Sequence, residues 1–166
     1  MDTDGFVTLA RSSSREEFRS KVAASFLILE NALFEDQQVG FATQVVDPAA
    51  VRRAAEKNRG KPAPNIEVLP VAKSPQNPYP DRVSIGRARN CDVVLRDPSV
   101  SKLHAHFRLG QPKLELVDID SQNGTRVNGR PLPAHQPLAV TPGDVILFGS
   151  VSVKLVDADT LYDLLR

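Results

Sequence analysis

The sequence predicts a mainly β protein, a β-sandwich that follows an N-terminal helical extension and precedes a short C-terminal helix. From about residue 61 onward apolar residues alternate with a period of two, whereas before it they recur at helical spacing. The candidate strands are short and regularly spaced, and Gly, Pro, Asn and Asp lie between them. We therefore divide the chain into a helical extension (residues 1–62), a β domain (residues 63–158) and a short C-terminal helix (residues 159–166).

Two helices are expected in the extension. Ser14 and Glu17, three residues apart, form a capping-box pattern at the start of the first helix. Apolar residues then recur on one helical face, at Phe18, Val22, Phe26, Leu29 and Leu33. The second helix is expected from Asp47-Pro48, an N-cap followed by a first-turn proline, to Gly60, a typical helix stop.

The β domain is expected to contain a series of short strands bounded by turn residues. The candidate segments are residues 66–71, 83–85, 91–95, 105–109, 114–117, 125–127, 138–140, 144–148 and 150–155. A last helix is expected after them, because Asp159-Thr160 can cap a helical turn that carries Leu161, Leu164 and Leu165.

The overall charge limits the classes of partner. The formal net charge is +1, so no global field draws the chain to nucleic acid or membrane, and an anion must be bound by a local arrangement. The basic residues between Arg52 and Lys61 have no interleaved aromatic residues that could stack on bases. No apolar stretch is long enough to span a bilayer, and Met1 to Ala10 lacks the apolar core of a secretory signal. A cytoplasmic location is therefore expected.

Neither catalysis nor metal binding has a complete set of residues. Ser101 and His104 are of the nucleophile and base types, but no G-x-S-x-G elbow surrounds Ser101 and no acid has a spacing that demands a triad. His104 and His106 would share one face of a strand, without a third ligand at a recognised zinc spacing. Cys91 is the single cysteine and is expected to be an inert, partly buried thiol. We expect no enzyme activity, no metal and no cofactor.

An anion-binding site fits the same region better. Gly86 allows an unusual backbone angle at the end of a strand and can aim Arg87 out of the loop. The Arg87 guanidinium offers a fork of donors that suits phosphate oxygens, and the Ser101 hydroxyl adds another donor. Asn123-Gly124 marks a tight turn, and an asparagine amide can both donate to and accept from a peptide backbone. Together these residues indicate a phosphate clamp beside a main-chain contact.

The ordered set of motifs resembles the forkhead-associated (FHA) domain family. The motifs that carry the resemblance are Gly86-Arg87, Ser101-x-x-His104, Asn123-Gly124 within residues 121–125, and Asn128-Gly129. Residues 91–95 resemble the strand before the family's serine loop, residues 117–120 the strand before its asparagine turn, and residues 142–146 its late turn and strand. The resemblance covers about residues 65–157.

The resemblance implies a β-sandwich of about eleven strands whose loops at one end bind phosphothreonine in an extended peptide. The residues that would contact the phosphate are Arg87, Ser101 and Lys102. Those that would border or hold the peptide main chain are Asn123 and Gln122, and those that would support the loops are Gly86, His104 and Gly124. Gln122 departs from the family's commonest pattern, in which Ser, Thr or Arg is frequent, so the peptide preference stays open.

The predicted function is a phosphothreonine-binding module in Ser/Thr kinase signalling or protein assembly. Its partners would be a phosphothreonine-containing protein and the upstream Ser/Thr kinase, without nucleic acid or membrane. An alternative is a scaffold that binds an unphosphorylated protein through the FHA fold or the N-terminal helices. The extension could cap an edge of the sandwich, mediate dimerisation, or present Thr3, Thr8 or Thr43 to the clamp.

Overall fold

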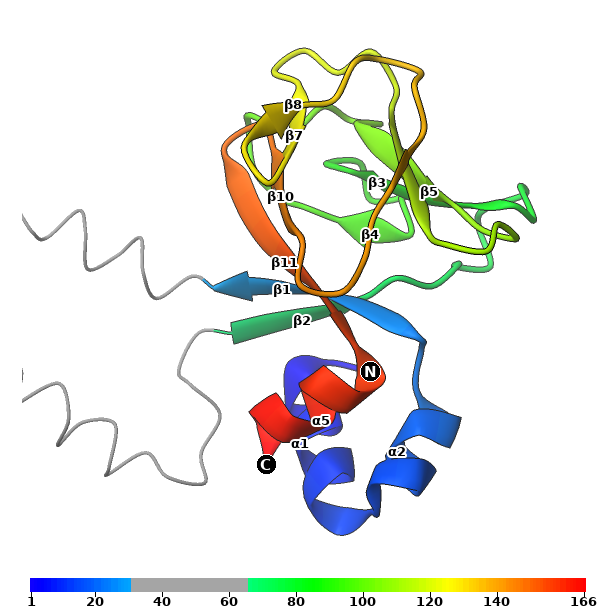
Figure 1. Ribbon diagram of the computed structural model, residues 1–166, viewed down its shortest axis with the longest axis vertical. Helices are drawn as coiled ribbons and strands as arrows, with labels where there is room; N and C mark the ends of the chain where they lie inside the picture. Colours follow the sequence, from blue (N-terminus) through cyan, green and yellow to red (C-terminus); the bar gives the residue numbers. More distant parts are fainter. Residues whose placement is uncertain (31–65) are drawn as a thin grey trace, which may run out of the picture.

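The computed structural model describes residues 1–30 and 66–166, which form two packed β-sheets and three helices (Figure 1). The helices are α1 (Thr3–Ser12), α2 (Arg15–Lys21) and α5 (Ala158–Leu165). The strands are β1 (Ser25–Glu30), β2 (Ile66–Pro70), β3 (Arg82–Gly86), β4 (Val93–Val94), β5 (Ala105–Arg108), β6 (Glu115–Asp118), β7 (Thr125–Val127), β8 (Arg130–Pro131), β9 (Leu138–Ala139), β10 (Val145–Phe148) and β11 (Val151–Asp157).

The two sheets confirm the predicted β-sandwich. One sheet has the strand order β2-β1-β11-β10-β7-β8, and the other has the order β4-β3-β5-β6-β9. Neighbouring strands run antiparallel except β3 and β4, which are parallel. The core between the sheets contains Ile85 of β3, Phe107 of β5, and Ile146 and Phe148 of β10, all fully buried. Their alternation along the strands is the period-two pattern of the sequence.

Strand β1 corrects the prediction of a helix that continues past Val22. Helix α2 ends at Lys21, and residues 25–30 pair with both β2 and β11 as an antiparallel strand. Leu27 faces the core between the sheets, whereas Phe26 and Ile28 face the opposite side of the same sheet. A strand buried on both faces is a continuous apolar run, and such a run has no two-residue alternation that distinguishes it from a helix.

The three helices cover the outer face of this sheet where β2, β1 and β11 lie (Figure 1). Their apolar side chains and those of β1, β2 and β11 form a second buried cluster, the helix-side core. Its members are Phe6, Val7, Ala10, Phe18, Phe26, Ile28, Val68, Val156, Ala158, Leu161, Tyr162 and Leu165. Arg15 pairs with Asp163 at its exposed rim. The N-terminal residues therefore belong to the same folded unit as the sandwich.

The caps of these helices follow ordinary rules. The predicted capping box at α2 is confirmed, since the Ser14 hydroxyl accepts from the Glu17 N–H and the Glu17 carboxylate accepts from the Ser14 N–H. Helix α5 begins one residue before the predicted Asp159, because Asp157 is its N-cap and accepts from the Thr160 N–H at 2.8 Å. The predicted helix at residues 47–60, Leu33 and the boundary at residue 62 lie outside the described residues. Within the described residues no helix is long and apolar enough to cross a membrane.

Candidate functional site

Three loops meet at one end of the sandwich and bring the predicted site residues together. The loop after β3 is tied to the β4–β5 loop by two main-chain hydrogen bonds, from the Arg87 N–H to the Ser101 carbonyl at 2.9 Å and from the Ala88 N–H to the Lys102 carbonyl at 3.1 Å. The β6–β7 loop joins them, because the Gln122 N–H donates to the Ser101 hydroxyl oxygen at 3.0 Å. Ser101 is therefore fixed from both sides.

Gly86 is required for close packing, and the prediction that it adopts an unusual backbone angle is wrong. It is absent from the glycines with positive φ in the described chain. A Cβ at this position would lie 2.9 Å from the Lys102 carbonyl carbon and closer still to its oxygen. Only a residue without a side chain lets the β4–β5 loop approach β3 so closely. Gly86 thus positions Ser101 and Lys102 beside Arg87.

Arg87 presents an exposed guanidinium at this junction. Its Nε donates to the Val100 carbonyl at 3.0 Å, which fixes the side chain along the β4–β5 loop. Among the described residues no carboxylate lies within ion-pair distance of it. Because a guanidinium has five N–H donors, its two terminal nitrogens stay available to an anion.

His104 is buried behind Ser101 and supports the loop that carries it. The Ser101 N–H donates to His104 Nδ1 at 3.0 Å, so Nδ1 is the unprotonated nitrogen and Nε2 donates to the Gly124 carbonyl at 3.0 Å. Burial lowers the pKa of His104, and the hydrogen bond to Gly124 and the charge of Asp118 oppose that shift without cancelling it. The imidazole is therefore neutral. It connects the β4–β5 loop, which carries Ser101 (the serine loop), to the β6–β7 loop, which carries Asn123 (the asparagine loop).

The geometry of His104 does not fit the role of a catalytic base for Ser101 or that of a metal ligand beside His106. Nδ1 faces the Ser101 backbone, and Nε2 faces Gly124, so neither nitrogen accepts from the Ser101 hydroxyl. His106 belongs to β5 but points away from the core, since its neighbours Ala105 and Phe107 are the core residues of that strand. The two histidines do not share a face, and within the described residues no three potential ligands gather into a metal site.

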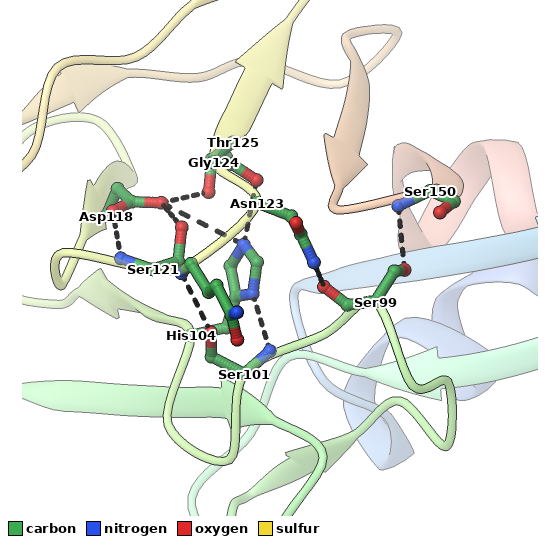
Figure 2. A network of polar contacts seen from close by, with 10 residues as sticks. Ser99, Ser101, His104, Asp118, Ser121, Asn123, Gly124, Thr125 and Ser150 are labelled. Carbon is green, nitrogen blue, oxygen red and sulfur yellow. Dashed lines mark hydrogen bonds and ion pairs between the residues drawn. The ribbon is translucent and has the colours of Figure 1, made fainter.

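Asp118 is a structural residue of the site that the sequence did not single out. Its carboxylate accepts from the Ser121 N–H at 2.9 Å and from the hydroxyls of Ser121 and Thr125, as Figure 2 shows. Burial raises the pKa of Asp118, but these hydrogen bonds outweigh burial and hold it below its ordinary value. The charged carboxylate shapes the turn that carries Gln122 and Asn123. The local signal for such a turn is that Asp and Ser are turn residues whose side chains hydrogen-bond nearby backbone groups.

Asn123 is held by Ser99 of the serine loop. Like Asp118, Ser99 was not predicted as a site residue. The Asn123 side-chain amide donates to the Ser99 carbonyl at 2.8 Å (Figure 2). Ser99 is itself fixed by Asp97, and its hydroxyl oxygen accepts from the Ser150 N–H at 2.9 Å. A primary amide has two N–H groups and a carbonyl, so Asn123 keeps further hydrogen-bonding capacity for a ligand.

The sequence model of the FHA domain family matches residues 83–149, which contain all of these loops. This part of the chain is an FHA domain. The family's motif residues Arg87, Ser101 and Asn123 lie on the three loops that meet, in agreement with the resemblance found in the sequence.

Curated relatives are similar to part of the chain. The chain is 41% identical over 64 residues to the oxoglutarate dehydrogenase inhibitor of Corynebacterium glutamicum, a match to 39% of this chain and 43% of that protein. It is 38% identical over 66 residues to the glycogen accumulation regulator GarA of Mycolicibacterium smegmatis, with 40% of each protein covered. The matches span less than half the length of these relatives.

A solved FHA domain shares the fold. The NMR structure of the yeast Dun1 FHA domain is 22% identical to this chain and has a TM-score of 0.50, with 84% of this chain and 78% of that chain covered. This similarity extends beyond residues 83–149, so it includes strands outside the segment that the family model matches.

The remaining predicted residues lie at the rim or at the back of the FHA loops. The side chains of Lys102 and Gln122 are exposed, and Gly124 has a φ of +80°, which favours glycine. Cys91 is buried behind the serine loop, where its thiol donates to the Lys102 carbonyl at 3.2 Å. Burial raises the pKa of Cys91, which keeps it a thiol and agrees with the structural role expected for it.

Proposed function

We propose that the chain binds phosphothreonine-containing proteins through its FHA domain, as a module of Ser/Thr kinase signalling. The observation that carries the proposal is the fixed pairing of two donors at one loop junction. The Arg87 N–H bonds to the Ser101 carbonyl, so the exposed guanidinium and the Ser101 hydroxyl belong to directly connected residues. The Dun1 FHA domain, which shares the fold, was solved with a doubly phosphorylated phosphothreonine peptide.

The donors of the site suit a phosphate group. The Ser101 hydroxyl oxygen accepts from the Gln122 N–H, which leaves its proton for a ligand oxygen. Phosphothreonine carries about −1.5 to −2 charges and three acceptor oxygens at pH 7. A charge-assisted bond from Arg87 contributes about 1.5–3 kcal/mol, against about 1 kcal/mol for a neutral bond from Ser101. Arg87 therefore dominates the phosphate affinity, and Lys102 adds a charge at the rim.

The peptide main chain is bound beside the phosphate in this proposal. Asn123 offers its amide carbonyl and its second N–H to the backbone of the ligand, while its first N–H holds Ser99. Gln122 contributes its exposed side chain to the same border, and Gly86, His104 and Gly124 support the loops from below.

The proposal assigns no catalysis to the chain. The base that Ser101 would need is engaged elsewhere, because His104 Nδ1 accepts from a backbone N–H and Nε2 donates to a carbonyl. A scaffold role of α1 and α2 has no specific support, since the apolar faces of these two described helices are already packed in the helix-side core.

The test is calorimetric titration of the full chain with a phosphothreonine peptide selected from an oriented library. The full chain is needed because a fragment of residues 61–166 lacks β1, the strand between β2 and β11. We expect Arg87→Ala to weaken binding about ten- to hundredfold and Ser101→Ala about fivefold. Arg11→Ala, the matched loss of an exposed arginine on α1, should leave the affinity unchanged. Unchanged binding by Arg87→Ala would overturn the proposal.

A further inference from the structure

A shallow depression extends from Arg87 beyond the predicted phosphate position. It has a volume of about 370 Å³ and is lined by Arg87, Arg96, Asp97 and Pro98. Neither Ser101 nor Lys102 lines it, so it is separate from the place where Arg87 and Ser101 would share a phosphate. Its size reaches the lower range of ligand pockets, about 300–1,000 Å³. The site therefore has room for a second group of the ligand next to the phosphate.

Arg96 is the second guanidinium that faces this depression. The residue before it is anchored, because Leu95 is buried and its N–H donates to the Gly86 carbonyl at 2.9 Å. Arg96 itself is exposed, and no carboxylate of the described part of the chain lies within 4.0 Å of its guanidinium nitrogens. Its position is thus set by the strand end that also sets Arg87, and its donors are available.

Asp97, the acidic residue of the same wall, is committed to the loop. Its Oδ1 accepts from the Ser99 N–H at 2.8 Å and from the Ser99 hydroxyl at 2.6 Å. Ser99 in turn holds Asn123 and Ser150, so the Asp97 carboxylate is part of the framework of the site. It forms no ion pair with Arg96, so the Arg96 guanidinium stays available to a ligand.

We propose that Arg96 is a specificity-determining residue that binds an acidic side chain close to the phosphothreonine of the ligand. The inference rests on the proposed function, because it requires that Arg87 and Ser101 bind the phosphate while Arg96 binds a second anionic group of the same ligand. A guanidinium matches a carboxylate with two parallel hydrogen bonds, a geometry that a nearby lysine does not supply. The preferred partner is thus a phosphothreonine segment with an Asp or Glu at one fixed distance from the phosphorylated residue.

The test is a peptide series in which a phosphothreonine lies among neutral residues and one glutamate is placed at each flanking position in turn. Affinities of the full chain are measured by calorimetry. We expect one glutamate position to strengthen wild-type binding roughly three- to tenfold over the neutral phosphopeptide, as suits an exposed but bidentate pair. Arg96→Ala should lose that gain while its affinity for the neutral phosphopeptide stays within about twofold.

Two further variants sharpen the result. Arg96→Glu should prefer lysine at the position where the wild type prefers glutamate, and Arg11→Ala should keep the wild-type preference. An equal loss of affinity for neutral and acidic peptides in Arg96→Ala would overturn the inference, as would a glutamate preference that survives the substitution. A wild type that binds phosphopeptides with no preference for acidic neighbours contradicts this inference alone. A wild type that binds no phosphopeptide contradicts the proposed function as well.

Discussion

The helix-side core and the three FHA loops, which carry Arg87, Ser101 and Asn123, are stabilised by opposite kinds of interaction. All members of the helix-side core are apolar side chains or Tyr162, contributed by α1, α2, α5 and three strands. Behind the FHA loops, in contrast, lie His104, Asp118 and Thr125, the buried polar side chains of the described residues. The helix-side core is stabilised mainly by apolar burial, beside a hydrogen bond from the Tyr162 hydroxyl to the Ser13 carbonyl, whereas the other region depends on a network of hydrogen bonds at defined distances.

This difference separates stability from recognition within one folded unit. Apolar burial tolerates small shifts, because its free energy follows the area removed from water. The loops tolerate little, because His104 connects Ser101 to Gly124 and Asp118 holds the turn before Asn123. Changes in the helix-side core should therefore lower stability and spare binding, and changes behind the loops should affect binding more than their cost in stability suggests.

The largest effect on stability is expected from Phe18→Ala. Phe18 is fully buried in the helix-side core and packs against Tyr162 with ring centroids 5.5 Å apart. The substitution should lower the free energy of unfolding by about 3–5 kcal/mol, as measured by urea denaturation, because it leaves a cavity. Leu164→Ala, on the exposed side of α5, should cost far less. If a Phe18→Ala protein is still folded but loses phosphopeptide affinity, the claim that the helix-side core affects stability and not binding is contradicted.

A smaller loss of stability, with a larger loss of binding, is expected from Gly86→Ala. The added methyl group meets the Lys102 carbonyl, so the serine loop must move at a cost of about 1–3 kcal/mol. We expect phosphopeptide affinity to fall at least about tenfold, because Arg87 and Ser101 are no longer in register. Gly110→Ala is the control, since Gly110 has a φ of +81° but no neighbour in the way. Equal binding by both variants would contradict the role given to Gly86.

The smallest effect is a pH dependence that arises behind the loops. The pKa of His104 is lowered in the folded chain, whereas an unfolded histidine titrates near about 6.5. Below that pH the unfolded chain gains a proton that the folded chain does not, so stability is full above about pH 6.5 and falls as the pH decreases. The melting temperature should therefore fall between pH 7 and pH 5, and less steeply in His104→Asn.

His106→Asn is the matched control for the effect of His104→Asn on binding. Burial also lowers the pKa of His106, so its replacement should flatten the pH dependence too. His106 lies on the outer face of β5, however, and forms none of the hydrogen bonds between the loops. His104→Asn should weaken phosphopeptide binding, and His106→Asn should not. A pH profile identical in the wild type and His104→Asn would show that His104 is not the group responsible.

Much of the sandwich could be predicted from the sequence because its strands alternate. The segments around β3, β5, β10 and β11 were recognisable from period-two patterns and the turn residues between them. Strand β1 was not, because its burial on both faces depends on β11 and on helices that are distant in sequence. A continuous apolar run next to a capped helix is compatible with more helix, and only the tertiary partners decide.

The site shows the same limit in finer detail. The order of Arg87, Ser101, His104 and Asn123 was enough to predict that their loops meet. The residues behind them were less visible, since the burial of Asp118 and the cross-link through Ser99 arise only when the loops come together. For Gly86 the position was predicted but the physical reason was wrong, because close approach between segments leaves no local pattern.

The most direct test of the central claim compares one peptide in two chemical states. The full chain is titrated by calorimetry with a library-selected phosphothreonine peptide and with the same peptide unphosphorylated. In the proposed clamp, Arg87 and Ser101 together would contribute several kcal/mol to phosphate binding, so we expect the phosphopeptide to bind on the order of a hundredfold more tightly. Equal affinity for the two peptides would contradict the phosphate clamp.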